Sequence, residues 1–158
     1  MIVHPIPPLF DKNSKTLILG SFPSVKSREA AFFYGHPQNR FWSVLAIIYG
    51  IPKPETVEEK SKLVLKNNLA LWDVIASCEI VGSSDSSITD VTANNLSVII
   101  ENSKVEKIFV NGKTAEKYYN KYTYAKTGIK AVCLPSTSPA IAAWNLERLV
   151  EAWKIIKE

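Results

Sequence analysis

The sequence predicts an α/β protein, a three-layer α/β/α sandwich built around a mostly parallel, four-stranded central sheet. Four short apolar runs are separated by stretches with helical patterns. The runs are continuous rather than alternating, which is typical of strands that are covered on both faces. Strand and helix signals also alternate along the chain, and this order favours right-handed crossovers between parallel strands. With 158 residues and no linker or repeat, the chain is predicted to form a single domain over residues 1–158.

The four predicted strands are TLILG at 16–20, LALW at 69–72, KIFVN at 107–111 and KAVCLP at 130–135. On an open parallel sheet, ligands bind beyond the carboxyl ends of the strands. The segments that directly follow the strands are therefore expected to be loops around the functional site: GSFPS, DVIAS, NGKTA and PSTSPA. The run CEIVGSSDSSITD, at 78–90, is predicted to be one long polar loop.

Helices are predicted between and after these strands. In NRFWSVLAIIYG, at 39–50, Phe41, Leu45 and Ile48 share one face. Pro54 and the acidic residues after it mark the start of a second helix over 54–68. Shorter helices are expected at 93–102 and 113–122. The C-terminal helix, over 145–158, carries an apolar stripe of Leu146, Leu149, Val150, Trp153 and Ile156.

Composition limits the possible classes of protein. Two cysteines are too few for a disulfide scaffold and lack metal-ligand spacing, and there are only two histidines, so neither a metal site nor a cofactor is predicted. The first ten residues do not resemble a signal peptide, and no apolar run approaches the roughly 18 residues of a membrane span. An intracellular, non-membrane protein is expected. The net charge of +4 allows an anionic partner without requiring one.

Serine-rich segments follow several of the predicted strands. Serine hydroxyls and free backbone amides at helix starts are good ligands for phosphate. Each segment alone is explained as a turn or a helix cap, but several at one sheet edge favour an anion site. The residues predicted to contact such an anion are Ser24, Ser27, Lys113, Ser136, Thr137 and Ser138. NGKTA lacks the glycine pattern of a P-loop.

Five motifs in order resemble the uracil-DNA glycosylase superfamily, and most closely its hypoxanthine-DNA (deoxyinosine) glycosylase branch, family 6. They are LGSFPS, FFYGHPQNRFW, LALWDVIASCEIVGSSDSSI, IFVNGKTA and LPSTSPA. HPQNRFW is also similar to a motif of the mismatch-specific uracil glycosylases. The resemblance covers residues from about 16 to 146. It implies a DNA glycosylase of base-excision repair that flips a damaged nucleotide into a pocket at the strand ends.

The resemblance implies that Asn39 is the catalytic residue. Most uracil enzymes of the superfamily carry an Asp or Asn in the first motif to handle the attacking water, whereas this chain has Phe22 there. In the hypoxanthine branch the polar group comes from the HPxNRFW segment, which places it at Asn39. A carboxamide has one acceptor and two donors in a fixed plane, and glycosidic cleavage needs a positioned water. From the residues alone, the favoured role of Asn39 is an N-cap of the helix that follows it, and capping and catalysis could both hold.

The base pocket is expected to include Ser21, Phe22, Tyr34 and Asp73. Tyr34 aligns with the ring on which the flipped base stacks in the mismatch-specific enzymes. Asp73 lies where the uracil enzymes carry an Asn that reads the base, but an ionised carboxylate accepts hydrogen bonds and cannot donate them. Base recognition, a protonated carboxyl, a loop contact and a general base all remain open for Asp73. His36 is predicted to contact base or phosphate, or to stabilise the turn before Pro37.

In the second motif of the superfamily, STSPA replaces His-Pro-Ser-Pro-Leu. Ser136 stands at the histidine position and Ala140 at the position of the wedging leucine, so weaker activity on uracil and a different wedge, Ile141, are expected. No lysine is placed as a Schiff-base nucleophile, and the iron–sulfur cysteines of some relatives are absent. A monofunctional, monomeric enzyme acting on DNA with a damaged base is therefore expected.

Three other functions remain as alternatives. A mismatch-specific or broad uracil-DNA glycosylase is favoured by NRFW and disfavoured by Phe22. A non-catalytic nucleic-acid-binding α/β domain would bind DNA without releasing a base. A small phosphate-ester enzyme ranks last, because no acid–base pair or metal-ligand set lies at suitable spacing.

Overall fold

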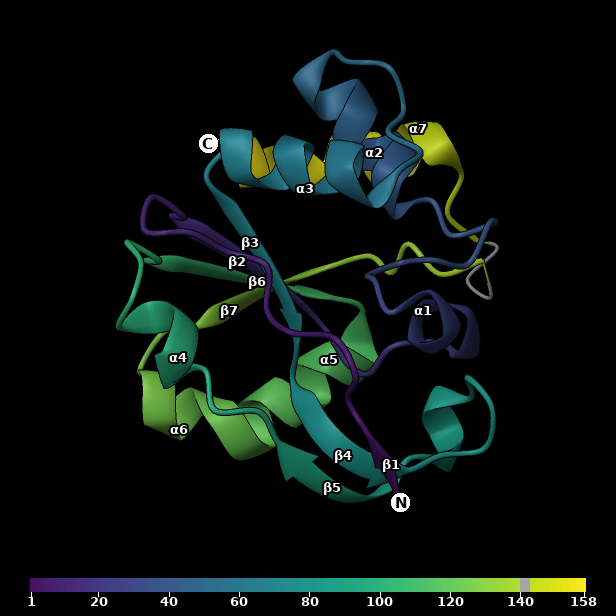
Figure 1. Cartoon of the computed structure of the whole chain (residues 1–158), viewed down its shortest axis with the longest axis vertical. Coiled ribbons are helices and arrows are strands. Elements are labelled where there is room, and N and C mark those ends of the chain that lie inside the picture. Colours follow the sequence, from purple (N-terminus) through teal and green to yellow (C-terminus); the bar gives the residue numbers. More distant parts are fainter. Residues whose placement is uncertain (140–142) are drawn as a thin grey trace.

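The central sheet contains four parallel strands in the spatial order β3-β2-β6-β7 (Figure 1). They are β2 (Thr16–Gly20), β3 (Leu69–Asp73), β6 (Lys107–Asn111) and β7 (Ala131–Leu134). The computed structural model describes residues 1–139 and 143–158. The four predicted strands are confirmed to within two residues at each end, and so are the α/β class and the parallel pairing.

Helices cover both faces of this sheet (Figure 1). One face carries α2 (Phe41–Tyr49), α3 (Val57–Lys66) and α7 (Leu146–Trp153), with a 3-10 turn at Lys154–Lys157. The other carries α4 (Ser97–Ile100), α5 (Lys113–Tyr118) and α6 (Tyr124–Thr127), and a π-helical turn over Tyr119–Thr123 joins the last two. A short helix, α1 (Val25–Ala30), follows β2 beside the sheet edge.

Two hydrophobic cores lie on opposite faces of the parallel sheet. Side chains alternate along a strand, so Ile18 packs in the core under α2, α3 and α7, together with Phe41 and Trp153. Leu17 and Leu19 point into the other core, which is closed by α4, α5 and the π-helical turn. All five residues of β2 are buried, which explains its continuous apolar sequence.

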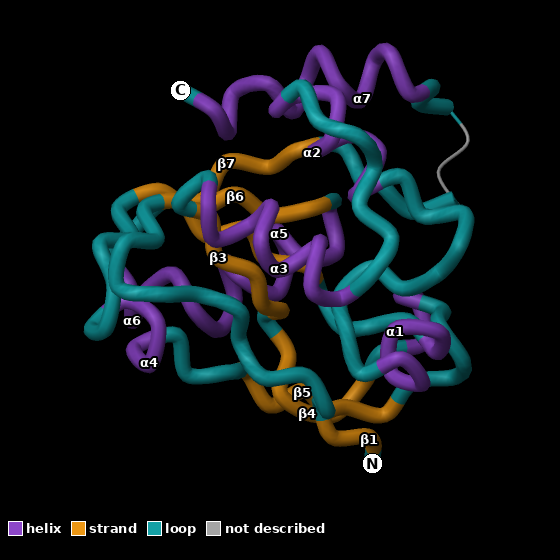
Figure 2. Tube along the Cα trace, turned by 45° about the horizontal axis from the view of Figure 1, so that its top comes forward, coloured by secondary structure: helices purple, strands orange, loops and turns teal. Residues whose placement is uncertain are grey.

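A second, antiparallel sheet of three strands was not predicted. It has the order β1-β4-β5 and contains β1 (Ile2–Val3), β4 (Ile75–Glu79) and β5 (Thr89–Ala93). The prediction of a loop over DVIAS is therefore wrong for most of that segment. The predicted polar loop at 78–90 begins inside β4 and ends inside β5, with a 3-10 turn at Asp85–Ser87 between them. Figure 2 shows β1, β4 and β5 beside one another near the N-terminus.

Several helix boundaries differ from prediction for local reasons. The helix predicted from Pro54 starts at Val57, because Thr56 forms a capping box with Glu59. The Thr56 side chain accepts from the Glu59 N–H, and the Glu59 carboxylate accepts from the Thr56 N–H. The helix predicted over 93–102 shortens to the four residues of α4. The apolar stripe of the last helix is buried except for Leu146, which is 37% exposed. Within the described residues, no helix is long and apolar enough to cross a membrane.

Removing the capping box of α3 should lower stability in a measurable way. We expect Thr56→Ala to lower the free energy of unfolding by about 1 kcal/mol, because it leaves the Glu59 N–H without an acceptor at the helix start. Ser61→Ala, inside the same helix, should be neutral or slightly stabilising. Urea unfolding of both variants would measure the difference. Equal losses in the two would contradict a capping role for Thr56.

Candidate functional site

A cavity of about 320 Å³ lies beyond the carboxyl ends of the parallel strands, walled by the loops that follow them. The pairing register sets its floor, since Gly20 pairs with Asp73 and Asn111 pairs with Leu134 at the same edge. All of the residues predicted for the site line this cavity except Lys113. The structure therefore brings the predicted residues together around one cavity, and their roles stay predictions.

Asn39 combines a cap with a free amide group. Its Oδ1 accepts a hydrogen bond of 2.9 Å from the backbone N–H of Phe41, two residues on, at the start of α2. Since a backbone N–H can only donate, the accepting atom is the carboxamide oxygen and the NH₂ group is the other end. No hydrogen-bond partner of this NH₂ lies within the described part of the chain. Asn39 is thus held in one orientation at the cavity wall with two donors still available.

Tyr34 is held between the core and the cavity. Its ring stacks on Phe41 with centroids 3.9 Å apart and planes at 19°. Its φ of 52° is in the left-handed region, where a non-glycine residue is strained, and such strain is common at functional sites. Its hydroxyl is buried and has no hydrogen-bond partner among the described residues. Burial is the main cause that raises the pKa of this hydroxyl well above its ordinary value. The charge of Asp73 raises the pKa further, and the nearby Asn111 side chain lowers it to a smaller extent.

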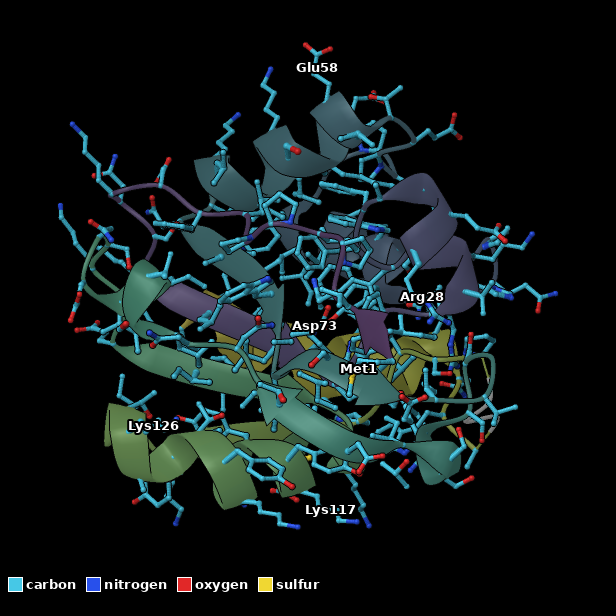
Figure 3. All side chains as sticks on the ribbon, turned by 60° about the horizontal axis from the view of Figure 1, so that its bottom comes forward. Met1, Arg28, Glu58, Asp73, Lys117 and Lys126 are labelled. Atoms are coloured by element: carbon cyan, nitrogen blue, oxygen red, sulfur yellow. The ribbon has the colours of Figure 1, made fainter. Side chains whose placement is uncertain are left out.

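Asp73, at the end of β3, contacts a histidine that the sequence reasoning had not assigned to the site. His4 Nε2 lies 2.7 Å from Asp73 Oδ2, and the two side chains are 3% and 6% exposed. On the other side, Asp73 packs over Gly20. A Cβ added at Gly20 would lie 2.4 Å from Asp73 Oδ1 and 3.2 Å from the Tyr34 hydroxyl. Figure 3 shows Asp73 in the middle of the molecule, whereas Lys117 and Lys126 project from its outer surface.

The segment after β7 is clamped by two side chains. Asn111 donates from Nδ2 to Thr137 Oγ1 at 3.0 Å and accepts from the Thr137 N–H at 3.1 Å. Arg40 donates from Nη2 to the Ser138 carbonyl at 3.1 Å and from Nη1 to the Trp144 carbonyl, on the far side of residues 140–142. These contacts hold the segment over residues 136–139, which lines one side of the cavity.

Two of the residues predicted to bind DNA are internal. Thr137 is fully buried and bonded to Asn111, and Ser27 is 2% exposed and accepts from the Gly35 N–H at 2.9 Å. They hold the cavity walls in place, and the prediction of direct DNA contacts by these two side chains is not supported. The cause is local: a small hydroxyl that satisfies a buried backbone group is not available to a ligand.

The other predicted DNA contacts are at least partly exposed. Ser24 caps α1 by accepting from the Ser27 N–H, and Ser136 Oγ accepts from the Ser138 N–H, so both act in turns as well as lining the cavity. His36 Nδ1 accepts from the Gln38 N–H, as expected of a turn histidine. Lys113 is exposed at the start of α5, outside the cavity lining. The proposed wedge positions, Ala140 and Ile141, lie outside the described residues.

Besides His4, sequence reasoning missed Asn111 and Asp85. Ser21 Oγ donates to Asp85 Oδ1 at 3.4 Å, so the 3-10 turn brings a second carboxyl to the cavity. Partial burial of this carboxyl raises its pKa, and the charge of Asp73 adds to the effect, while hydrogen bonds from Thr114 and Ser21 oppose it. Asn111 was foreseeable, since it ends a predicted strand. His4 and Asp85 were not, because the sheet that carries them joins remote segments.

The loop that presents Asp85 is anchored to α1. Arg28 donates from Nη2 to the Gly82 carbonyl at 2.7 Å, and the Val25 N–H donates to Ser83 Oγ at 2.9 Å. No three His, Cys, Asp or Glu side chains gather as a possible metal site anywhere in residues 1–139 and 143–158. The polar and aromatic side chains that line the cavity carry carboxamide, carboxylate, hydroxyl, imidazole and aromatic groups.

Comparisons with known proteins agree with this geometry. A sequence model of the uracil DNA glycosylase superfamily matches residues 7–157. A protein of Methanosarcina acetivorans named hypoxanthine DNA glycosylase is 34% identical over 158 residues, covering 99% of this chain and 98% of the relative. A protein of the same name from Methanosarcina barkeri is 32% identical over 115 residues, covering 71% and 72% of the two chains.

The fold is also found in a solved structure. The solution NMR structure of a candidate uracil DNA glycosylase from Methanosarcina acetivorans superimposes with a TM-score of 0.81 and 30% sequence identity. The alignment covers 100% of both chains. The α/β/α architecture is thus shared over the whole length.

Gly20→Ala should disturb the site more than other glycine changes, because the added Cβ would clash with the Asp73 carboxylate. We expect a loss of roughly 1–3 kcal/mol in the free energy of unfolding, as for other overpacked positions. Gly35→Ala is the control, since its Cβ would come no closer than 3.3 Å to any neighbour and its φ is also not left-handed. Urea unfolding should rank Gly20→Ala as clearly the more destabilised. The reverse order would show that Asp73 moves aside without cost.

Tyr34→Phe should change the stability of the protein in alkali. The pKa of Tyr34 is raised in the folded state, so its contribution is fully present below the unfolded value near 10 and is lost as the pH rises above it. We expect the phenylalanine variant to lose less stability above pH 10. Tyr49, whose pKa is raised to about 12 by burial, is present in both proteins and cancels in the difference. Unfolding free energies from pH 8 to 11 would measure it, and parallel curves would contradict burial of the hydroxyl.

Proposed function

The chain belongs to the uracil DNA glycosylase superfamily, and from this premise we propose that it is a monofunctional DNA glycosylase that excises deaminated bases, hypoxanthine first, in base-excision repair. The observation that carries the proposal is the gathering of Asn39, Phe22, Tyr34 and Asp73 around one cavity at the strand ends. A volume of about 320 Å³ is within the range of small-molecule sites, which begins near 300 Å³. The full-length similarity to a protein named hypoxanthine DNA glycosylase supports the choice of base.

In the proposed reaction, water adds to C1′ of the deoxyribose as the bond to the base nitrogen breaks. The electron pair of that bond leaves with the base, and the sugar passes through an oxocarbenium-like state. Asn39 is the catalytic residue, because its carboxamide can orient the water or stabilise the developing charge. Its Oδ1 is fixed by the Phe41 N–H, so its NH₂ group is preorganised at the cavity wall.

The flipped base is held between aromatic and polar walls. Tyr34 presents a ring that is supported from behind by Phe41, and Phe22 supplies a second wall. Aromatic stacking is the usual way to hold an extruded base. Asp73 lies at the floor and accepts from the base edge, while Ser24, Ser136 and Ser138 line the cavity where phosphates of the DNA backbone would approach.

Uracil release is the second candidate activity. The solved structure with the same fold is described as a candidate uracil DNA glycosylase. Uracil and hypoxanthine each present a ring N–H, so an acceptor at Asp73 can bind that N–H in both, although it offers no donor to the neighbouring carbonyl. Phe22 removes the polar side chain that uracil enzymes use in the first motif, which favours hypoxanthine as the first substrate. The proposed enzyme acts as a monomer on DNA inside the cell.

Asn39 can be tested by a pair of variants that separate capping from catalysis. Asn39→Ala removes both functions, while Asn39→Asp keeps an oxygen for the Phe41 N–H and removes the NH₂ donors. We expect each variant to slow the release of hypoxanthine by about 100-fold or more, as for the loss of one transition-state donor. The measurement is single-turnover release from oligonucleotides that contain one hypoxanthine or one uracil, followed by alkaline cleavage of abasic sites.

Asn95→Ala is the matched control, because Asn95 Oδ1 accepts from the Ser97 N–H two residues on and Asn95 does not line the cavity. This variant should lose the stability that the cap contributes at the start of α4, and it should release hypoxanthine at the rate of the parent protein. Release of uracil alone would assign the protein to the uracil branches. DNA binding with no release of any base would reject the enzyme and leave a nucleic-acid-binding domain.

A further inference from the structure

His4 lies behind the cavity, in contact with Asp73 and Phe22 of its lining. Its backbone N–H donates to the Ala76 carbonyl at 2.8 Å, which continues the pairing of β1 with β4. Its ring meets Phe22 and Trp72 edge-on, with centroids 5.9 Å and 6.3 Å away. Both ring nitrogens are engaged, because Nδ1 lies 3.2 Å from the Ile6 nitrogen and Nε2 lies 2.7 Å from Asp73 Oδ2.

These contacts determine which ring nitrogen carries the proton. The Ile6 N–H can only donate, so Nδ1 must offer a lone pair. A neutral imidazole then has its single proton on Nε2, and this N–H donates to Asp73 Oδ2. Asp73 Oδ2 therefore accepts the hydrogen bond from His4. The second oxygen, Oδ1, has no hydrogen-bond donor among the described residues and packs over Gly20 at the cavity floor.

A buried His–Asp pair is not required for the fold. The surrounding groups are apolar, and two buried polar groups could be replaced by apolar ones of similar shape with little loss of stability. Removing one partner of such a pair, in contrast, leaves the other unsatisfied. The pair therefore points to a function in which the state of Asp73 matters.

We infer that His4 is a positioning residue that holds Asp73 as a pure hydrogen-bond acceptor, and that the pair selects bases whose ring nitrogen carries a proton. Deamination creates this feature, because adenine N1 and cytosine N3 are acceptors, whereas hypoxanthine N1 and uracil N3 carry a proton. The lone pairs of the parent bases would face the carboxylate and be repelled. This inference rests on the proposed function, since it concerns the same cavity and the same reaction.

A double-mutant cycle tests whether His4 acts through Asp73. The variants are His4→Leu, Asp73→Asn and the double variant, and the measurement is single-turnover release of hypoxanthine at saturating enzyme. We expect His4→Leu to slow release by about tenfold to a hundredfold in the parent protein, the range for a hydrogen bond to a charged group. On the Asp73→Asn background the same change should cost less than about threefold, because the two residues act as one unit.

The same set of variants tests selectivity. Oligonucleotides with deoxynebularine carry a purine without the ring N–H or the carbonyl, so the parent protein should strongly prefer hypoxanthine. His4→Leu should slow hypoxanthine release and leave purine release unchanged, which lowers the preference by the same factor. A side chain that only stabilised the fold would slow both substrates equally.

Two further variants keep the test decisive. Trp72→Phe removes the 3.1 Å bond from Trp72 Nε1 to the Ile6 carbonyl, so it loosens the same segment without removing the donor to Asp73. It should retain release and preference. His4→Gln keeps an N–H at the end of the side chain and should stay within a few-fold of the parent protein, even where His4→Leu does not fold.

Several results would overturn the inference. These are additive losses in the cycle, an equal loss in Trp72→Phe, or a folded His4→Gln variant without preference. If the parent protein releases no hypoxanthine at all, the proposed function fails instead, and this outcome is read before any variant is compared.

Discussion

The register between β2 and β3 is the constraint on which the rest of the site depends. It places Gly20 directly opposite Asp73 at the last position of each strand. Because Gly20 has no side chain, the Asp73 carboxylate and the Tyr34 hydroxyl can both approach its Cα. A shift of one residue would turn Asp73 to the other face of the sheet, away from His4. The geometry of the cavity floor is thus set by backbone pairing before any side chain is placed.

The mixed composition of FFYGHPQNRFWSVL has a physical explanation in this arrangement. Phe33, Phe41 and Trp42 are buried and hold the segment against the core, with Trp42 Nε1 donating to the Phe33 carbonyl at 3.1 Å. The polar residues between them form a turn, in which the Asn39 N–H donates to the His36 carbonyl. Rigid aromatic packing on one side keeps a carboxamide and an imidazole in place on the other. Aromatic and polar residues serve one purpose here, which is preorganisation.

Much of the fold could be predicted, because the four parallel strands are buried on both faces and therefore have continuous apolar sequences. The gathering of the predicted site residues around one cavity followed, since the ends of parallel strands meet at one edge. The antiparallel sheet could not be predicted: β1 has only two residues, and β4 and β5 pair across a polar loop. Consequently His4 and Asp85 were missed. The burial of Ser27 and Thr137 was missed as well, because a sequence does not show whether a hydroxyl faces a backbone amide or a ligand.

The way in which His4 reaches the site has a consequence for dynamics. His4 and Asp73 are 69 positions apart in the sequence, and the segment that brings His4 lies on the outer edge of β3. The N-terminal segment is held by the pairing of β1 with β4, by the bridge between Leu9 and Leu71 of β3, and by the hydrogen bond from the Trp72 side chain to the Ile6 carbonyl. Such an edge opens at a lower free energy than the central strands, as a separate cooperative unit. Opening of this segment would remove the contact between His4 and Asp73 while the parallel sheet stays folded, so we expect heat to disrupt the site before it melts the core.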